Sequence, residues 1–415
     1  MLLEFRCSNY RSIKNTVTFS MIAGSDDSHP QSLRHSLGLK ILPSAVVYGA
    51  NGSGKSNFLK ALSYMANLAR TSILNQPGQK IAYDPHKLCV GKPTSMSIQF
   101  IRQGVRYAYG FSILDGFVED EYLYFFPKGR QTRIFERSGL SVIAGSRFQS
   151  ALKLGLEALK DNRLFLSCAA NFTKVIELES AFLFFAQDLV FFDPLFNNWR
   201  EYSAFAMHDD PEMKRLFLLF MDCFGTGVKD VEVRIEKKPV SEISSSMPPH
   251  LSPFLKDGEA NLIEAMLVYD QFSVNIMEES SGTRRLFEVL CPLIDILRND
   301  RILVCDELEA SLHEALVHQI VELFSTQTDD HSAQLLFTTH DTNLLDGNLM
   351  RRDQIWFTQL DHERSSDLYS LSEVRAVRKS ENLAKGYMSG KYGAMPMLNG
   401  TILSQICAGQ ESGDK

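Results

Sequence analysis

The chain has 415 residues, 44% of them hydrophobic and 22% charged, which is enough to build the cores of two to three domain-sized units. Its formal net charge of -7 is not that of a dedicated duplex-DNA binder, although a local basic patch fits within that total. The seven cysteines form no Cys-x-x-Cys pair and the N-terminus has no leader-like segment, so we expect a cytoplasmic protein without disulfides or a membrane span.

The first part of the chain has the apolar-polar alternation of strands. Residues 1–20 predict two short strands joined by a turn, and residues 45–48 predict a buried strand that enters a glycine loop. Apolar residues at helical spacing over 58–68 then predict a helix. Alternation resumes over 95–137. We therefore expect a sheet-rich N-terminal lobe that contains a strand, loop and helix in sequence.

The rest of the chain changes character twice. Residues 148–227 show helical periodicity, and residues 229–238 alternate like a strand before a Ser/Pro-rich loop at 239–253. From residue 286 onward, helical and strand-like segments alternate, with the strands expected at 302–305, 335–338 and 355–357. That alternation predicts an α/β fold with a parallel sheet and crossover helices.

Residues 49–56 read G-A-N-G-S-G-K-S and match the phosphate-binding pattern G-x-x-x-x-G-K-[ST] in its required context, between a strand and a helix. In such a loop the glycines allow backbone N–H groups to face phosphate oxygens, Lys55 neutralises phosphate charge and Ser56 can ligate Mg²⁺. The sequence therefore predicts ATP and Mg²⁺ as ligands. The candidate nucleotide-binding residues are Gly49, Asn51, Gly52, Ser53, Gly54, Lys55, Ser56 and Asn57, with Arg11 in the N-terminal turn.

Two further strands end in polar side chains. The strand at 302–305 ends in Asp306, which would hold Mg²⁺ directly or through water, and Glu307, which would polarise the attacking water. The strand at 335–338 is followed by His340, placed to contact the γ-phosphate. The alternatives are a solvated acidic turn for the carboxylates and a solvated loop residue for the histidine.

The segment 279–283, Glu-Ser-Ser-Gly-Thr, opens the helix that precedes the acidic strand. A serine hydroxyl and backbone N–H groups at a helix N-terminus would bind a γ-phosphate. The alternative is an ordinary N-cap serine. The segment resembles a diverged ABC signature, with Ser280 and Gly282 in the positions of the signature serine and second glycine. The resemblance implies that the phosphate belongs to a second copy and that residues 311–313 face the dimer as a D-loop.

Together these motifs resemble ABC-type ATPases of the SMC, RecF and DNA-repair class, over residues 1–125 and 255–400. Closer resemblance is to stand-alone ATPases of bacterial phage-defence operons, namely RloA-like proteins and the ATPase subunit of PARIS systems. This resemblance implies a homodimer or higher homo-oligomer. It also implies a phage trigger and a separately encoded effector, such as a TOPRIM nuclease, in a defence that works by abortive infection. The segments that carry it are F-R-C-S-N-Y-R-S-I at 5–13, E-S-S-G-T-R-R-L at 279–286, R-R-D-Q-I-W at 351–356 and G-K-Y-G-A-M-P at 390–396.

The resemblance divides the chain into an N-terminal part of the ATPase head (1–147), a mainly helical insertion (148–254), a C-terminal part of the head (255–400) and a tail (401–415). Departures from the family pattern are Glu279 in place of leucine, Thr283 in place of glutamine, and no glutamine in the segment 83–86, where a Q-loop is expected.

Two other functions stay open from the sequence. One is a DNA-repair-type ATPase that clamps nucleic acid on a basic surface, and the other is a metabolic NTPase. A group of aromatic residues in the insertion suits either partner docking or the insertion's own core. These are Phe191, Phe192, Phe196 and Trp199.

Overall fold

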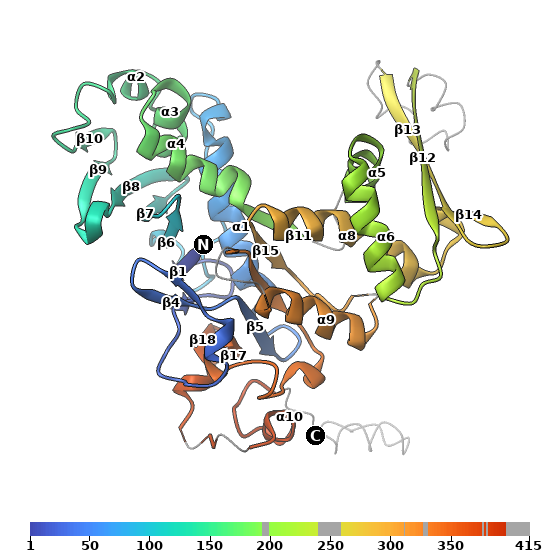
Figure 1. Ribbon diagram of the computed structural model, residues 1–415. Coiled ribbons are helices and arrows are strands. Elements are labelled where there is room, and N and C mark those ends of the chain that lie inside the picture. The colour runs from blue at the N-terminus through green and yellow to red at the C-terminus, as the bar shows by residue number, and fades with distance from the viewer. Residues whose placement is uncertain are drawn as a thin grey trace, which may run out of the picture. The chain divides into compact units, whose positions relative to one another are not determined.

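The computed structural model describes residues 1–192, 199–239, 259–310, 312–326, 331–375, 377–378 and 381–395 (Figure 1). Two compact units divide the chain. The central unit is Gln187–Phe337, and the split unit joins Leu2–Ala186 to Thr338–Lys415. The boundary expected at 147/148 lies within the Leu2–Ala186 part of the split unit, and the one expected at 254/255 lies outside the described residues.

A seven-stranded antiparallel sheet forms the first layer of the split unit, in the order β10-β9-β8-β7-β6-β1-β2. Its strands alternate buried and partly exposed residues, so one face packs on the core. Phe58 of helix α1 (Lys55–Thr71) packs between Phe5 and Phe19, with ring centroids 5.9 and 5.3 Å away. The strands predicted in this region are confirmed: β1 Leu2–Ser8, β2 Val17–Ser20, β6 Thr94–Arg102, β7 Val105–Leu114, β8 Phe117–Phe125 and β9 Thr132–Ser138. Strand β10 (Ser141–Ala144) lies beyond the residues for which strands were predicted.

The second layer of the split unit contains the strand that enters the glycine loop. All six residues of β5 (Ser44–Gly49) are buried, and β5 pairs in parallel with β17 (Ile355–Leu360). Strand β18 (Ser366–Ser370) adds antiparallel to β17. The predicted strand, loop and helix at 45–68 are thus confirmed. The remaining elements are β3 Arg34–Ser36, β4 Leu39–Ile41, α2 Lys153–Glu157, α3 Phe165–Phe172, α4 Ile176–Leu183 and α10 Leu383–Met388.

A fully buried ion pair attaches α3 to the antiparallel sheet. The Glu121 carboxylate accepts hydrogen bonds from the backbone N–H groups of Phe165 (2.5 Å) and Leu166 (2.9 Å), at the positive end of α3. The guanidinium of Arg137 lies 3.1 Å from the same carboxylate, and neither side chain is exposed. Removing one partner leaves an uncompensated buried charge, which costs about 3–5 kcal/mol.

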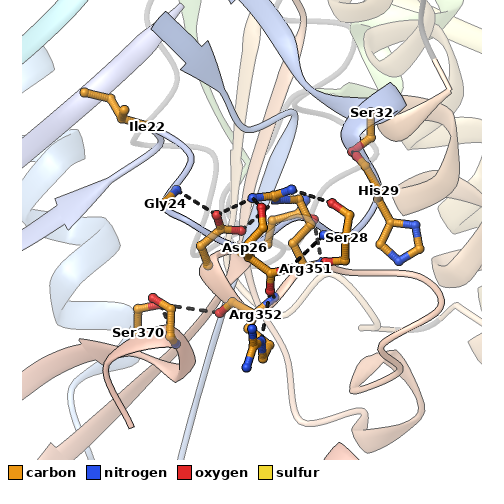
Figure 2. Close-up of polar contacts among 12 residues, drawn as sticks. Ile22, Gly24, Asp26, Ser28, His29, Ser32, Arg351, Arg352 and Ser370 are labelled. Atoms are coloured by element: carbon orange, nitrogen blue, oxygen red, sulfur yellow. Dashed lines mark hydrogen bonds and ion pairs between the residues drawn. The ribbon is translucent and has the colours of Figure 1, made fainter. Parts of the chain in front are cut away.

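A second cluster of charges joins the loop after β2 to the segment before β17 (Figure 2). Arg351 is 1% exposed and bonds both carboxylate oxygens of Asp353, through Nε (2.9 Å) and Nη2 (2.7 Å). Arg351 Nη2 also donates to the Asp26 carbonyl (2.6 Å), and Arg352 Nε donates to the Asp26 carboxylate (2.9 Å). Burial raises the pKa of Asp26, but hydrogen bonds from Ser28 and Arg352 outweigh it and lower the pKa overall. The first three residues of the R-R-D-Q-I-W segment therefore have a structural role.

The central unit contains the predicted parallel strands. Strand β15 (Ile302–Cys305) pairs in parallel with β16 (Gln334–Thr338) and with β11 (Leu189–Phe192). The helix predicted over 148–227 is wrong at β11. Four consecutive apolar residues fit a buried strand as well as a helix, and here the pairing with β15 determines that they form a strand. Helices α5 Trp199–Asp209, α6 Pro211–Cys223, α8 Ser281–Arg298 and α9 Glu314–Ser325 complete the helical part.

A long antiparallel hairpin also belongs to the central unit (Figure 1). Strand β12 (Asp230–Pro239) pairs with β13 (Glu259–Val268), which pairs with β14 (Ser273–Asn275). The strand predicted at 229–238 is confirmed. Within the described residues, no helix has both the length and the apolar composition needed to cross a membrane.

Candidate nucleotide-binding site

Two glycines of the loop between β5 and α1 stand where a side chain would not fit. Gly54 has φ 111°, and a Cβ there would lie 2.1 Å from Ser366 Oγ. At Gly49 a Cβ would lie 2.4 Å from Thr358 Oγ1. The backbone is thus packed as closely as the phosphate-binding pattern requires, and the glycines at the ends of the loop cannot be replaced without moving β17 or β18.

Hydroxyl groups from three other segments hold this loop, and the motif does not include them. Ser366 Oγ donates to the Ser53 carbonyl (2.7 Å) and lies 2.7 Å from Ser12 Oγ, whose hydroxyl can donate to it. Asn57 Nδ2 donates to Ser12 Oγ (2.8 Å), and Ser53 Oγ lies 2.6 Å from Thr358 Oγ1. Ser12 is next to Arg11, so the motif at residues 5–13 is the one feature of the sequence that points to it. Nothing in the sequence marks Thr358 or Ser366.

The lysine of the loop is held inside it. Lys55 is 6% exposed, and its Nζ donates to the Gly49 carbonyl (2.8 Å) and the Ala50 carbonyl (3.4 Å). Ser56 follows, half-buried, in the first turn of the 17-residue helix α1, where the helix dipole favours negative charge. These residues fit a bound polyphosphate, with Lys55 as its cation and Ser56 as a ligand for Mg²⁺.

Arg11 lies in the turn between β1 and β2, one residue before Ser12. Its backbone N–H donates to the Asp84 carbonyl (2.7 Å), and its guanidinium lies 3.3 Å from the Asp84 carboxylate. The structure thus places the side chain on the segment 83–86, where no Q-loop glutamine is found. A cavity of about 500 Å³ opens beside it, with Tyr10 and Tyr64 among its lining residues.

His340 is an exposed residue two positions after the end of β16. On one side of it the Thr339 N–H contacts the Val47 carbonyl (3.5 Å), and on the other Tyr48 Oη donates to the Asp341 carbonyl (2.8 Å). Both contacts are to β5, so the structure places His340 beside the strand that leads into the glycine loop.

In the central unit, Asp306 and Glu307 follow β15 as predicted. Asp306 is half-buried and its N–H contacts the Phe192 carbonyl (3.4 Å). Glu307 is exposed and has φ 51°, the left-handed region that costs a non-glycine residue about 1–2 kcal/mol. Its carbonyl accepts from the Ala310 N–H (2.9 Å), which closes the turn. The predicted base therefore sits in a strained backbone, as residues at functional sites often do.

The segment 279–283 forms the N-terminus of α8, an 18-residue helix. Ser280 is the N-cap, and its Oγ accepts from the Thr283 N–H (3.1 Å). Glu279 accepts from Tyr269 Oη (2.7 Å), and burial together with this carboxylate raises the pKa of Tyr269 to about 12. Ser280 is exposed and Gly282 half-buried. The N-cap role is thus confirmed, and the same end of the helix presents its positive pole to solvent.

A cavity of about 230 Å³ adjoins this helix end and is lined by Arg200, Arg284 and Arg285 together with Ser281 and Glu288. Arg285 is 5% exposed, its guanidinium lies 4.1 Å from the centre of the Phe192 ring, and burial lowers its pKa. Its Nε has no hydrogen-bond partner among the described residues. These arginines are not among the site residues predicted from the sequence, although two of them lie in the E-S-S-G-T-R-R-L segment.

The candidate residues divide between the units. The glycine loop, Arg11 and His340 are in the split unit, whereas Ser280, Gly282, Asp306 and Glu307 are in the central unit. Of the predicted D-loop, Ser311 lies outside the described residues, and His313 caps α9 by accepting from the Ala315 N–H (3.2 Å).

The aromatic residues predicted for the insertion are partly accounted for. Phe196 lies outside the described residues. Phe192 is 4% exposed and its ring centroid is 4.1 Å from that of Trp199. Phe192 therefore belongs to the core of the central unit.

A buried strand, a glycine loop with left-handed backbone and a following helix define the class, a P-loop nucleoside-triphosphate-binding domain. The family model described as "AAA domain, putative AbiEii toxin, Type IV TA system" matches residues 44–346, and the chain belongs to that family. The match includes every candidate site residue except Arg11. No curated protein matches the sequence.

Among solved structures, the chain is similar to three heads of SMC proteins. The SMC head domain from Thermotoga maritima is 11% identical, with a TM-score of 0.42 over 89% of this chain and 98% of that one. An SMC head bound to the C-winged helix domain of ScpA is 15% identical (TM-score 0.45, 91% and 99% covered). A head with an extended coiled coil, bound to the C-terminal domain of ScpA derived from Pyrococcus furiosus, is 15% identical (TM-score 0.38, 89% and 96% covered).

Proposed function

We propose that the chain binds and hydrolyses ATP with Mg²⁺ and so acts as the sensor or scaffold of an antiphage system, holding or releasing a separately encoded, nuclease-like effector. The observation that carries the ATPase part is the glycine loop, closely packed around Gly49 and Gly54 with Lys55 buried inside it. The defence part is supported by the family description, which names a toxin of a toxin–antitoxin system, and by the motifs that resemble ATPases of phage-defence operons.

Each candidate residue has a role in this proposal. MgATP supplies the phosphoanhydride bond that is hydrolysed. Lys55 and the backbone N–H groups of the loop hold the phosphates, and Ser56 and Asp306 hold Mg²⁺. Glu307 takes a proton from the attacking water. His340, beside β5, binds the terminal phosphate.

We place the hydrolytic site between two copies of the chain. Ser280 and Gly282 of one copy would meet the ATP held by the glycine loop of the other. The exposure of Ser280, the positive pole of α8 and the arginines Arg200, Arg284 and Arg285 that line the adjoining cavity support this arrangement, because each favours an anion supplied from outside the unit.

The second candidate function is a nucleic-acid clamp of the RecF or SMC kind. The observation that favours it is the cavity lined by Arg200, Arg284 and Arg285, which would suit backbone phosphates as well as ATP. Salt-dependent DNA binding that is lost in an Arg200→Glu variant would support the clamp, whereas ATP hydrolysis without DNA binding supports the sensor.

The test of the sensor role separates the ATPase from the effector. We expect the purified chain to hydrolyse ATP and to cut neither DNA nor RNA in the presence of Mg²⁺. Expressed alone it should not arrest growth, and co-expression with the product of the adjacent gene should do so only when Glu307 is intact. Nuclease activity of the purified chain that disappears in both Lys55→Ala and Glu307→Gln would place the effector within this chain and overturn the proposal.

A further inference from the structure

Strand β12 has an edge that no described strand covers. In the three-stranded sheet of the central unit the order is β12-β13-β14, so β12 is bonded on one side only. The edge is ten residues long, Asp230–Pro239. An edge of this length is a template for pairing with another strand unless its side chains prevent it.

The exposed face of β12 carries charges of alternating sign. Glu232, Arg234, Glu236 and Lys238 have side chains 56%, 72%, 62% and 40% exposed. The opposite face includes Val231, which is 1% exposed in the core of the central unit, and ends in the exposed Lys237. One face is thus fixed by packing, and the other presents four charges in a row.

When two copies of β12 run antiparallel with Ile235 opposite Ile235, each of the four charged side chains faces one of opposite sign in the other copy. Residues equally far from Ile235 then face each other across the pair, so Glu232 meets Lys238 and Arg234 meets Glu236. By the two-fold symmetry each contact occurs twice. Directly opposite side chains of opposite charge stabilise an antiparallel pair, and like charges destabilise it.

Neighbouring registers lack this match. With Arg234 at the centre it faces itself and Glu232 faces Glu236, and with Glu236 at the centre it faces itself and Arg234 faces Lys238. Edge charges usually keep strands apart, and a row of one sign would do so here. The alternating charges of β12 instead disfavour the registers centred on Arg234 and Glu236 and favour the register centred on Ile235.

We propose that β12 is a self-association surface that pairs antiparallel with β12 of a second copy about a two-fold axis at Ile235. The three strands of each copy then form one continuous sheet. The in-strand ion pairs do not compete strongly, because Arg234–Glu232 (3.9 Å) and Lys238–Glu236 (3.4 Å) are exposed. This contact is independent of the proposed nucleotide-bridged dimer.

The first test is a charge swap in nucleotide-free protein with EDTA, measured by sedimentation equilibrium. Glu232→Lys and Lys238→Glu should each weaken self-association by about tenfold, because each places two pairs of like charges face to face. The double variant should restore it to within about threefold of the wild type. These positions are preferable to Arg234, which lies opposite Glu264 of its own hairpin.

The matched control is the same swap on α6, where Glu212 and Arg215 form an exposed ion pair in the same unit. Glu212→Lys/Arg215→Glu should leave self-association unchanged. All variants should keep the unfolding temperature of the wild type, which shows that the hairpin is intact. A wild-type chain that stays monomeric without nucleotide, or single and double variants that associate equally, would overturn the proposal.

The second test reads the register. In a Cys223→Ser/Cys407→Ser background, Ile235→Cys should form a disulfide between copies on mild oxidation, because directly opposite Cα atoms lie within disulfide range. Arg234→Cys should cross-link much less, since it faces position 236 of the other copy. Equal cross-linking at 234 and 235 would refute the register, and none at either would refute the pairing.

Discussion

The glycine loop and the N-terminus of α8 are both candidate phosphate sites, but they differ in how complete they are. Lys55 is 6% exposed, and the loop around it is held by Ser12, Thr358 and Ser366 from its own unit. At α8, Ser280 is exposed, and Arg285 is buried with an Nε that has no partner among the described residues. The glycine loop is thus held by residues of its own unit, whereas at α8 the buried Arg285 lies 3.8 Å from the Glu288 carboxylate beside an exposed helix end.

The difference predicts that the two sites contribute to different steps of the reaction. Binding of ATP should depend on the loop only, and hydrolysis on both sites together. Variants of the two sites should therefore fail in different ways, and four predictions follow from the largest effect to the smallest.

Lys55→Ala should weaken ATP binding by at least about 100-fold and abolish hydrolysis, because it removes the charge that neutralises the phosphates. Binding is measured by isothermal titration calorimetry. The variant also loses the bonds from Nζ to the Gly49 and Ala50 carbonyls, so its circular dichroism must match that of the wild type. Unchanged affinity in a folded variant would contradict the assignment of the loop.

Ser280→Arg should keep ATP binding and stop hydrolysis, since a long cation would occupy the place of the second copy's γ-phosphate. Mixing it with Lys55→Ala protein should recover part of the activity, because the mixed dimer contains one intact composite site. Ser280→Ala is the milder control. Absence of recovery at every ratio, with mixed dimers demonstrated, would count against a shared site.

Glu307→Gln should bind ATP normally and hydrolyse it at least about 100-fold more slowly, because the amide keeps the shape of the side chain and cannot accept the proton. Single-turnover kinetics separates this step from product release. Wild-type turnover would exclude Glu307 as the base.

The free energy of unfolding of the Glu307→Gly variant should exceed that of the Glu307→Ala variant by about 1 kcal/mol, because glycine adopts φ 51° without strain. Urea denaturation measures the difference. The matched control is Glu322, exposed in α9, where the glycine variant should be less stable than the alanine variant. The same sign at both positions would mean that the backbone at Glu307 stores no strain.

The glycine loop, the strands around it and the acidic strand end could all be predicted, because each is encoded by consecutive residues with a fixed period or spacing. The helical assignment failed at Leu189–Phe192, where pairing with β15 decides the conformation. The supports Thr358 and Ser366 lie more than 300 residues from the loop and belong to no local pattern. The same distance conceals the contact of Asp26 with Arg351 and Arg352. Long-range partners of this kind are set by the tertiary fold.

The position of those supports in the chain has a consequence for biosynthesis. Ser53 is made early, but its partners Thr358 and Ser366 follow it by 305 and 313 residues. Strand β5 likewise acquires its neighbour β17 only after residue 355. A growing polypeptide therefore carries the whole glycine motif long before it can form the pocket. Truncated or stalled products that contain the motif but end before residue 366 should be unable to bind nucleotide, so ATP binding would report that synthesis has passed this point.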